Sequence, residues 1–394
     1  MKRVITIVLL TAVAAFGFAG TEELEIYSYL YDGAQTNSEQ LAILQNVAEL
    51  KVNGAGEFYA GALRRLVTNY RNIRNVTERS AADQQAMLLA GLLGIEKYTA
   101  AAPDLWRTVE TFADPLVKAE ALMSLGKMRA TAFLPQVVKL LSDLNATSTP
   151  DRLTGERIAF GAVVALEKYQ DPSGYFPVYF ASVGWYSDRI KSQAGKSLVL
   201  ISADPTEYMT QIIQSGGYAY TVKLTALQSM EASTASEDSK SAVALAALSE
   251  GHRASTNVVA QRTALNQMRK LAINMINRYK TEDEAVYLLL ERSYKQFAER
   301  VDGDRDEALD AIVTLAALGT DESARRLSAF LMDINRKLQS GAHTRKDEDL
   351  IREIIPALGK TGRAIARPAL SSVTALDWTP AVKELAREAL QNIK

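Results

Sequence analysis

Two short strings in the sequence resemble the end of a phosphate-binding loop, which would point to nucleotide chemistry. They are Gly-Lys-Ser at 195–197 and Gly-Lys-Thr at 359–361. A phosphate-binding loop also needs a glycine five residues before the Gly-Lys pair. Ile190 and Ile354 occupy those positions, and both strings fall in sequence with helical periodicity. The sequence therefore predicts no nucleotide site at either string.

Metal and acid–base chemistry are also poorly supported by the residue spacing. Asp302, Asp304 and Asp306 have the 1-3-5 spacing of a calcium loop. That loop needs Gly at its sixth position and Glu at its twelfth, where this chain has Glu307 and Val313. A charged turn is therefore the preferred interpretation.

The chain has few residues that could support histidine-based or cysteine-based catalysis or metal binding. The chain has two histidines, His252 and His343, both in polar, turn-like sequence, and it has no cysteine. No H-E-x-x-H or G-x-S-x-G pattern is present, so the usual zinc, thiol and serine sites lack their ligands or nucleophiles. We expect no catalytic residues, no cofactor and no metal, and thus no enzyme; a carboxylate-based site is the remaining enzymatic alternative.

An aromatic cluster is the first candidate for recognition. Its seven members are Tyr169, Tyr175, Phe176, Tyr179, Phe180, Trp185 and Tyr186. On a helix, the Phe pair and the Tyr pair form two adjacent stripes, and the core can accept the Phe pair. Tyr175, Tyr179, Trp185 and Tyr186 are therefore candidate partner-binding residues for peptides or glycans. The alternative is an aromatic-rich core.

An arginine cluster is the second candidate. Its members are Arg64, Arg65, Arg71, Arg74 and Arg79, with Glu78 as the one acid among them. Arg64 and Arg71 would share a helical face that could bind carboxylates or phosphates. A solvated outer face is the alternative.

The elements that must position these side chains are short amphipathic helices. In three places Leu-Gly is followed, after eight residues, by Pro: the Gly/Pro pairs are Gly94/Pro103, Gly126/Pro135 and Gly359/Pro368. We expect the Gly to end one helix in a left-handed conformation and the Pro to open the next helix. Repeated helix pairs follow, at 37–71, 80–112, 114–144, 151–183, 187–214, 218–248, 255–301, 304–338 and 345–375, with a last helix at 379–393 and a frayed helix or short strand within 20–36.

Two segments, Ala121–Leu141 and Ile354–Val373, carry a family resemblance. Their Ala/Leu-rich helix, Leu-Gly and following Pro resemble the HEAT-repeat family, including its short bacterial repeats. The resemblance implies an all-α fold, a right-handed α-solenoid of about nine HEAT-like helix-turn-helix repeats. It also implies a scaffold that binds partners along a curved surface, with no particular chemistry.

The first nineteen residues have the layout of a secretory signal peptide. Lys2 and Arg3 precede an apolar run, Val4–Phe16, and small residues stand at positions 17 and 19. The apolar segment is shorter than the ~20 residues that span a bilayer, although a retained anchor is the alternative. We expect a Sec-type signal at 1–19, a single solenoid at 20–394, and a periplasmic or secreted product that is not a lipoprotein and has no stable membrane insertion after cleavage.

The composition limits the choice of partner. With 47% hydrophobic and 23% charged residues and a formal net charge of −1, the chain should fold and has no overall electrostatic attraction to nucleic acid. The first functional hypothesis is a non-catalytic scaffold for a protein or peptide in the cell envelope. The alternatives are a glycan or cell-wall interaction module and an enzyme with an unrecognised carboxylate site.

Overall fold

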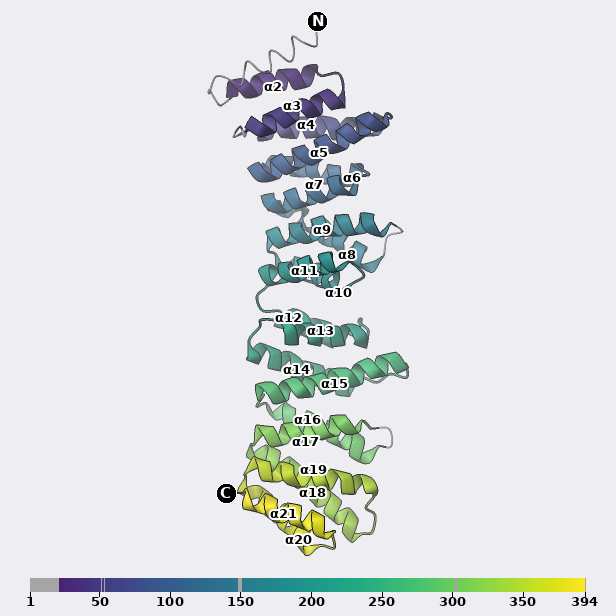
Figure 1. Cartoon of the computed structure of the whole chain (residues 1–394), viewed down its shortest axis with the longest axis vertical. Coiled ribbons are helices and arrows are strands. Elements are labelled where there is room, and N and C mark those ends of the chain that lie inside the picture. Colours follow the sequence, from purple (N-terminus) through teal and green to yellow (C-terminus); the bar gives the residue numbers. More distant parts are fainter. Residues whose placement is uncertain (1–20, 51, 53, 148–150, 301–302, 394) are drawn as a thin grey trace. The chain divides into compact units, whose positions relative to one another are not determined.

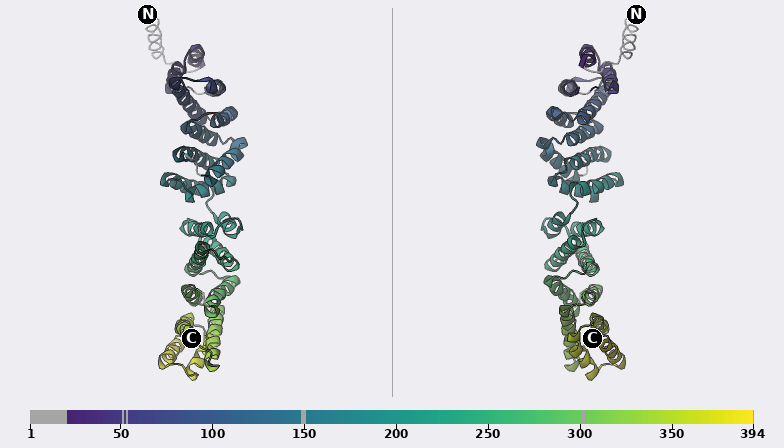
Figure 2. Two further views of the ribbon diagram at one scale, coloured as in Figure 1. Left: turned by 90° about the vertical axis from the view of Figure 1, so that its right-hand side faces the viewer. Right: turned by 90° about the vertical axis from the view of Figure 1, so that its left-hand side faces the viewer.

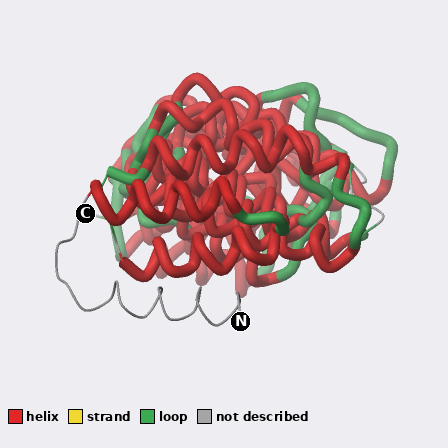
Figure 3. The backbone as a smooth tube through the Cα atoms, turned by 90° about the horizontal axis from the view of Figure 1, so that it is seen from above, coloured by secondary structure: helices red, strands yellow, loops and turns green. Residues whose placement is uncertain are grey.

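In the computed structural model the described residues are 21–50, 52, 54–147, 151–300 and 303–393. Their regular structure consists of twenty α-helices, α2 to α21, and five short 3₁₀ helices, with no strand (Figure 3). The helices group into two compact units, 1–203 and 204–394. Residues 1–19, where the sequence predicts a signal peptide, lie outside the described part.

The first unit contains helices α2 to α11 (Figure 1). Their bounds are α2 Thr21–Gly33, α3 Asn37–Leu50, α4 Gly56–Asn69, α5 Val76–Glu96, α6 Ala102–Thr111, α7 Pro115–Met128, α8 Leu134–Ala146, α9 Arg152–Tyr169, α10 Tyr175–Val183 and α11 Asp188–Ile201. Helices α3, α5, α7, α9 and α11 pack side by side in one layer, and α4 packs on α6 and α8 on α10 in the other. Within this unit, each pair covers the apolar face of its neighbour.

The second unit contains helices α12 to α21 in the same kind of arrangement. Their bounds are α12 Thr206–Gln214, α13 Tyr220–Ala232, α14 Glu237–Arg253, α15 Val259–Tyr279, α16 Glu284–Glu299, α17 Arg305–Leu318, α18 Asp321–Gln339, α19 Arg345–Thr361, α20 Arg367–Ala375 and α21 Pro380–Gln391. Odd-numbered helices form one layer and even-numbered helices the other. The side views in Figure 2 show the two layers within each unit.

The predicted fold class, all-α with helices packed pairwise in sequence, is confirmed. The predicted pairs match the observed helices closely, and within the segment at 20–36 residues Thr21–Gly33 form the helix α2, which is the helical one of the two alternatives. One predicted pair, 187–214, is divided between the units, because α11 belongs to the first and α12 to the second. No helix among the described residues is long and apolar enough to cross a membrane.

The Leu-Gly motif has a different role from the one predicted. The prolines do stand in the first turn of α6, α8 and α20. The glycines, however, lie inside α5, α7 and α19, and the left-handed residues that end these helices come later, at Lys97, Arg129 and Gly362. The expectation that Gly ends the helix was therefore wrong.

These glycines instead allow neighbouring helices of one layer to approach each other closely. A Cβ atom on Gly126 of α7 would lie 2.5 Å from the Cα of Ala165 in α9. A Cβ on Gly359 of α19 would lie 2.9 Å from the Cα of Ala389 in α21. No real Cβ fits at such distances, so the absent side chain is what permits the spacing of the layer.

Candidate functional site

The predicted tyrosine surface lies mostly in the core. Tyr175, Tyr179 and Tyr186 are only 3%, 1% and 2% exposed. Tyr175 and Tyr179 belong to α10, which packs against α8, α9 and α11. Because α10 is covered on several sides, its tyrosine stripe is buried, whereas Phe176 and Phe180, which the sequence assigned to the core, are only partly buried. The surface position that the spacing suggested for these tyrosines is thus not what the structure shows.

The indole N–H of Trp185 makes a hydrogen bond within the protein. The side chain is partly buried, and its indole Nε1 donates a hydrogen bond to the Leu144 carbonyl oxygen, 3.1 Å away. Its ring lies against that of Tyr186, with the centroids 4.2 Å apart. These contacts join the loop after α10 to the end of α8, so they stabilise the fold without requiring a ligand.

The two candidate arginines lie in different elements. Arg64 lies on α4 and pairs with the buried carboxylate of Asp104 on α6, at 3.0 Å. Arg71 is exposed in the 3₁₀ turn Tyr70–Asn72, beyond the end of α4 at Asn69. Arg64 is therefore already paired within the protein, and Arg71 lies beyond the helix on which the sequence placed it.

A groove on the first unit presents a set of residues that the sequence interpretation missed. It has a volume of about 470 Å³ and is lined by residues of α5, α7, α9 and α11 and of the turn before α11. These are Met87, Leu116, Ala119, Glu120, Met123, Leu153, Glu156, Arg157, Phe160, Ser187, Arg189 and Ile190. We call this surface the layer groove.

Two small residues, Ala119 and Gly161, let α7 and α9 lie close together at the floor of the layer groove. A Cβ on Gly161 of α9 would lie 2.6 Å from the Cα of Ala119 in α7, so the two backbones are in close contact there. Leu116 on α7 and Leu153 on α9 also line the groove and are 44% and 56% exposed. The groove is therefore formed on two closely spaced helices that expose leucines at the surface.

The groove carries a surplus of positive charge. Its two carboxylates are already paired, Glu120 with Lys127 at 3.2 Å and Glu156 with Arg152 at 3.0 Å. In the part of the chain that the structure describes, neither of its two arginines has a carboxylate within ion-pair distance, and Arg189 lies over the Phe160 ring, 5.1 Å from its centroid. Counting the two cations that pair with these carboxylates, and Asp151, whose pKa the charge of Arg157 helps to lower, four cations stand against three carboxylates and leave one positive charge.

A signal for this groove was present in the sequence. Leu116, Glu120 and Met123 recur at i, i+4 and i+7, as do Leu153, Arg157 and Phe160. This spacing marks one helical face. On α7 it marks a second face, because the core face of that helix is formed by residues such as Leu122 and Leu125. A second stripe that combines apolar and charged residues, in addition to the core stripe, indicates an exposed surface of mixed character.

Comparisons with known proteins place few constraints on this site. No protein-family model matches the chain, and no curated protein matches it significantly in sequence. Among solved structures, the chain is similar to human deoxyhypusine hydroxylase in complex with glycerol, with 14% identity and a TM-score of 0.24, over 86% of this chain and 96% of that one. Among the described residues there is no group of three or more His, Asp or Glu side chains that could hold a metal ion.

Proposed function

We propose that the chain is an exported, non-catalytic HEAT-like scaffold that binds a peptide segment of a cell-envelope protein in the layer groove. The observation that supports this most is the combination, in one groove, of exposed Leu116 and Leu153 with Arg157 and Arg189. Exposed apolar patches rimmed by polar groups are typical of protein-interaction sites.

The composition of the groove defines the chemistry of the peptide. Apolar side chains of the ligand would enter between Leu116 and Leu153, over the Ala119 floor, where burying each one is worth roughly 1.5–3 kcal/mol. Acidic side chains beside them would meet Arg157 and Arg189, which can bind carboxylates in a bidentate manner. The expected ligand is therefore a segment with apolar anchors flanked by Asp or Glu.

Fluorescence anisotropy with three labelled peptides of equal length tests this proposal. One peptide combines leucines with glutamates, the second combines leucines with lysines, and the third combines serines with glutamates. We expect saturable binding of the first alone, because only it satisfies both the apolar floor and the surplus charge. Binding should weaken as salt is raised, since exposed charge pairs are screened.

The matched variants are Leu153→Asp and Leu288→Asp. Both leucines are about half exposed, at 56% and 47%, and Leu288 lies on α16 in the second unit. Leu153→Asp should reduce affinity by at least tenfold, which corresponds to 1.4 kcal/mol, whereas Leu288→Asp should leave it unchanged. Equal binding of all three peptides, or an equal effect of both variants, would refute the groove as the binding site.

A further inference from the structure

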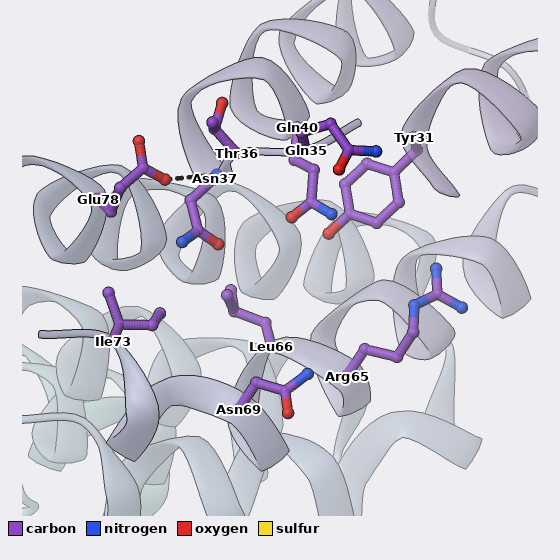
Figure 4. A pocket seen from close by; sticks show the side chains of 10 residues that line it. All are labelled: Tyr31, Gln35, Thr36, Asn37, Gln40, Arg65, Leu66, Asn69, Ile73 and Glu78. Carbon is purple, nitrogen blue, oxygen red and sulfur yellow. Dashed lines mark hydrogen bonds between the residues drawn. The ribbon is translucent and has the colours of Figure 1, made fainter. Parts of the chain in front are cut away.

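A second, smaller pocket lies among the first helices of the first unit. It has a volume of about 240 Å³. One wall comes from α2, α3 and the turn between them, and the opposite wall from α4, as Figure 4 shows. Its lining includes four carboxamide side chains: Gln35, Asn37, Gln40 and Asn69. We call it the amide pocket.

The wall of the amide pocket that α2 and α3 form is held in place by a buried glutamine. Gln85 of α5 is fully buried, and its Oε1 accepts a hydrogen bond from the Tyr31 hydroxyl at 3.2 Å. Its Nε2 donates to the Asn37 carbonyl oxygen at 2.5 Å. One side chain thus ties both α2 and α3 to α5, so this wall is organised before any ligand arrives.

The two charged groups of the pocket are already engaged inside the protein. Arg65 pairs with Asp32 at 2.9 Å. Glu78 accepts hydrogen bonds on both carboxylate oxygens, from the Asn37 backbone N–H at 2.6 Å and from the Ser38 hydroxyl at 3.0 Å. A charged ligand would have to compete with these contacts, so the pocket favours an uncharged one.

The carboxamides differ from these charged groups, because some of them have hydrogen-bond donors and acceptors that a ligand could use. Neither Gln40 nor Asn69 makes a side-chain hydrogen bond to another described residue, and both line the pocket. A carboxamide offers two N–H donors and one carbonyl acceptor. Hydroxyl groups donate and accept in the same way, so a ligand with several hydroxyls could use both capacities of each amide.

From this arrangement we propose that the amide pocket binds a single neutral saccharide unit. Its volume lies below the ~300–1,000 Å³ of ordinary small-molecule sites, which suits one sugar ring rather than a chain buried along its length. Ile73 in the lining is partly exposed and offers apolar contact to ring C–H groups. Tyr31 is only 2% exposed, so recognition relies on hydrogen bonds and not on ring stacking. This proposal rests on different residues from the layer groove.

The test is a titration followed by NMR or calorimetry, using glucose, galactose and N-acetylglucosamine as neutral probes. Glucuronate and glucosamine serve as the anionic and cationic probes. We expect saturable binding of at least one neutral sugar, with weaker binding of both charged ones. Asn69→Ala and Gln40→Ala should each lower the affinity about 2- to 10-fold, as expected for the loss of a hydrogen bond.

The control is Gln84→Ala, which removes an exposed carboxamide from α5 outside the pocket lining. This variant should bind as the unchanged protein does, and thermal melting should show that all three variants are folded. Absence of saturable binding for every neutral sugar would overturn the proposal. So would preferred binding of glucuronate, or equal losses in Gln84→Ala and Asn69→Ala.

Discussion

Arg269 and Glu307 form a buried ion pair within the second unit. They are 6% and 1% exposed, and the Arg269 Nε lies 3.0 Å from each Glu307 carboxylate oxygen. The remaining donors of Arg269 reach the Gly251 carbonyl oxygen at 3.2 Å and the Asn266 side chain at 2.8 Å. One guanidinium therefore links α14, α15 and α17.

Replacing one partner of this pair should destabilise the protein strongly. In Arg269→Met the Glu307 carboxylate would stay buried without its counter-charge, which typically costs about 3–5 kcal/mol. Urea unfolding measures the change. The control is Arg387→Met, which breaks an exposed pair with Glu384 and should change stability little, since exposed pairs contribute little. Similar losses in both variants would contradict the assignment.

His252 makes the stability of the second unit depend on pH. It lies in the last turn of α14, where its ring is partly buried and its Nε2 is 3.0 Å from the Ser293 hydroxyl. Burial, aided by the charges of Arg269 and Arg292, lowers the pKa of His252 to about 4. The polar turn that the sequence suggested around this histidine is in fact the end of a helix.

The sign of the effect follows from which state binds the proton first. Below pH 6.5 the unfolded chain takes up a proton on this histidine while the folded protein does not, so stability should fall as pH falls from 6.5 towards 4. The loss should reach about 2 kcal/mol at pH 5. In His252→Gln, the midpoint of urea unfolding should depend less on pH between 6.5 and 4. The same pH dependence in the variant and the unchanged protein would refute this role of His252.

At the scale of the helix, close backbone contacts at glycines determine how near neighbouring helices of a layer can lie. A Cβ on Gly126 would also lie 2.7 Å from the Ala165 carbonyl oxygen, and neither backbone can move without shifting the helix layer. Gly126→Ala should therefore destabilise the protein by about 1–3 kcal/mol, the usual range for overpacking. Differential scanning calorimetry would measure it.

Gly195 provides the matched control for this substitution. It is exposed within α11, and nothing lies within 4 Å of the position that a Cβ would occupy. Gly195→Ala should stabilise the protein by up to about 1 kcal/mol, because alanine is the better helix former. If the two substitutions shifted the melting temperature in the same direction, close packing at Gly126 would not be the cause.

The helices themselves were predictable, since apolar spacing and the prolines depend only on nearby residues. Which side chains the other helices cover was not predictable in this way. Spacing on α10 could not show that its tyrosine stripe is buried by its neighbours, and helical periodicity ran past Asn69, where α4 ends. The layer groove was missed although its stripes on α7 and α9 can be read in the sequence, because a stripe on one helix does not show that neighbouring helices leave it uncovered.

At the scale of the whole molecule, the helices form two compact units. Each unit buries its own apolar faces, with helices packed against their neighbours in sequence. In such arrays stability is approximately a sum of the repeats and their nearest-neighbour interfaces. Arg269→Met and Gly126→Ala lie in different units and share no partner, so their effects on stability should add in the double variant.

The export proposal makes a prediction about the chain itself. If residues 1–19 are a cleaved signal, protein recovered from the periplasm or the medium should begin at Gly20. Intact-mass analysis of each cell fraction would determine this. Full-length protein held in the membrane fraction would instead support the retained anchor, while full-length protein in the cytoplasm would contradict both interpretations.

The close contact between Ala119 and Gly161 affects how the peptide preference of the groove could change during evolution. The distance between α7 and α9 is limited at Gly161, which lies outside the groove lining and touches backbone atoms of Ala119 in the groove floor. A single added methyl group there would push the groove walls apart while leaving every residue that meets the ligand unchanged. The residue at position 161 thus controls the width of the groove, and related chains could differ in the peptides they accept through a position outside the groove lining.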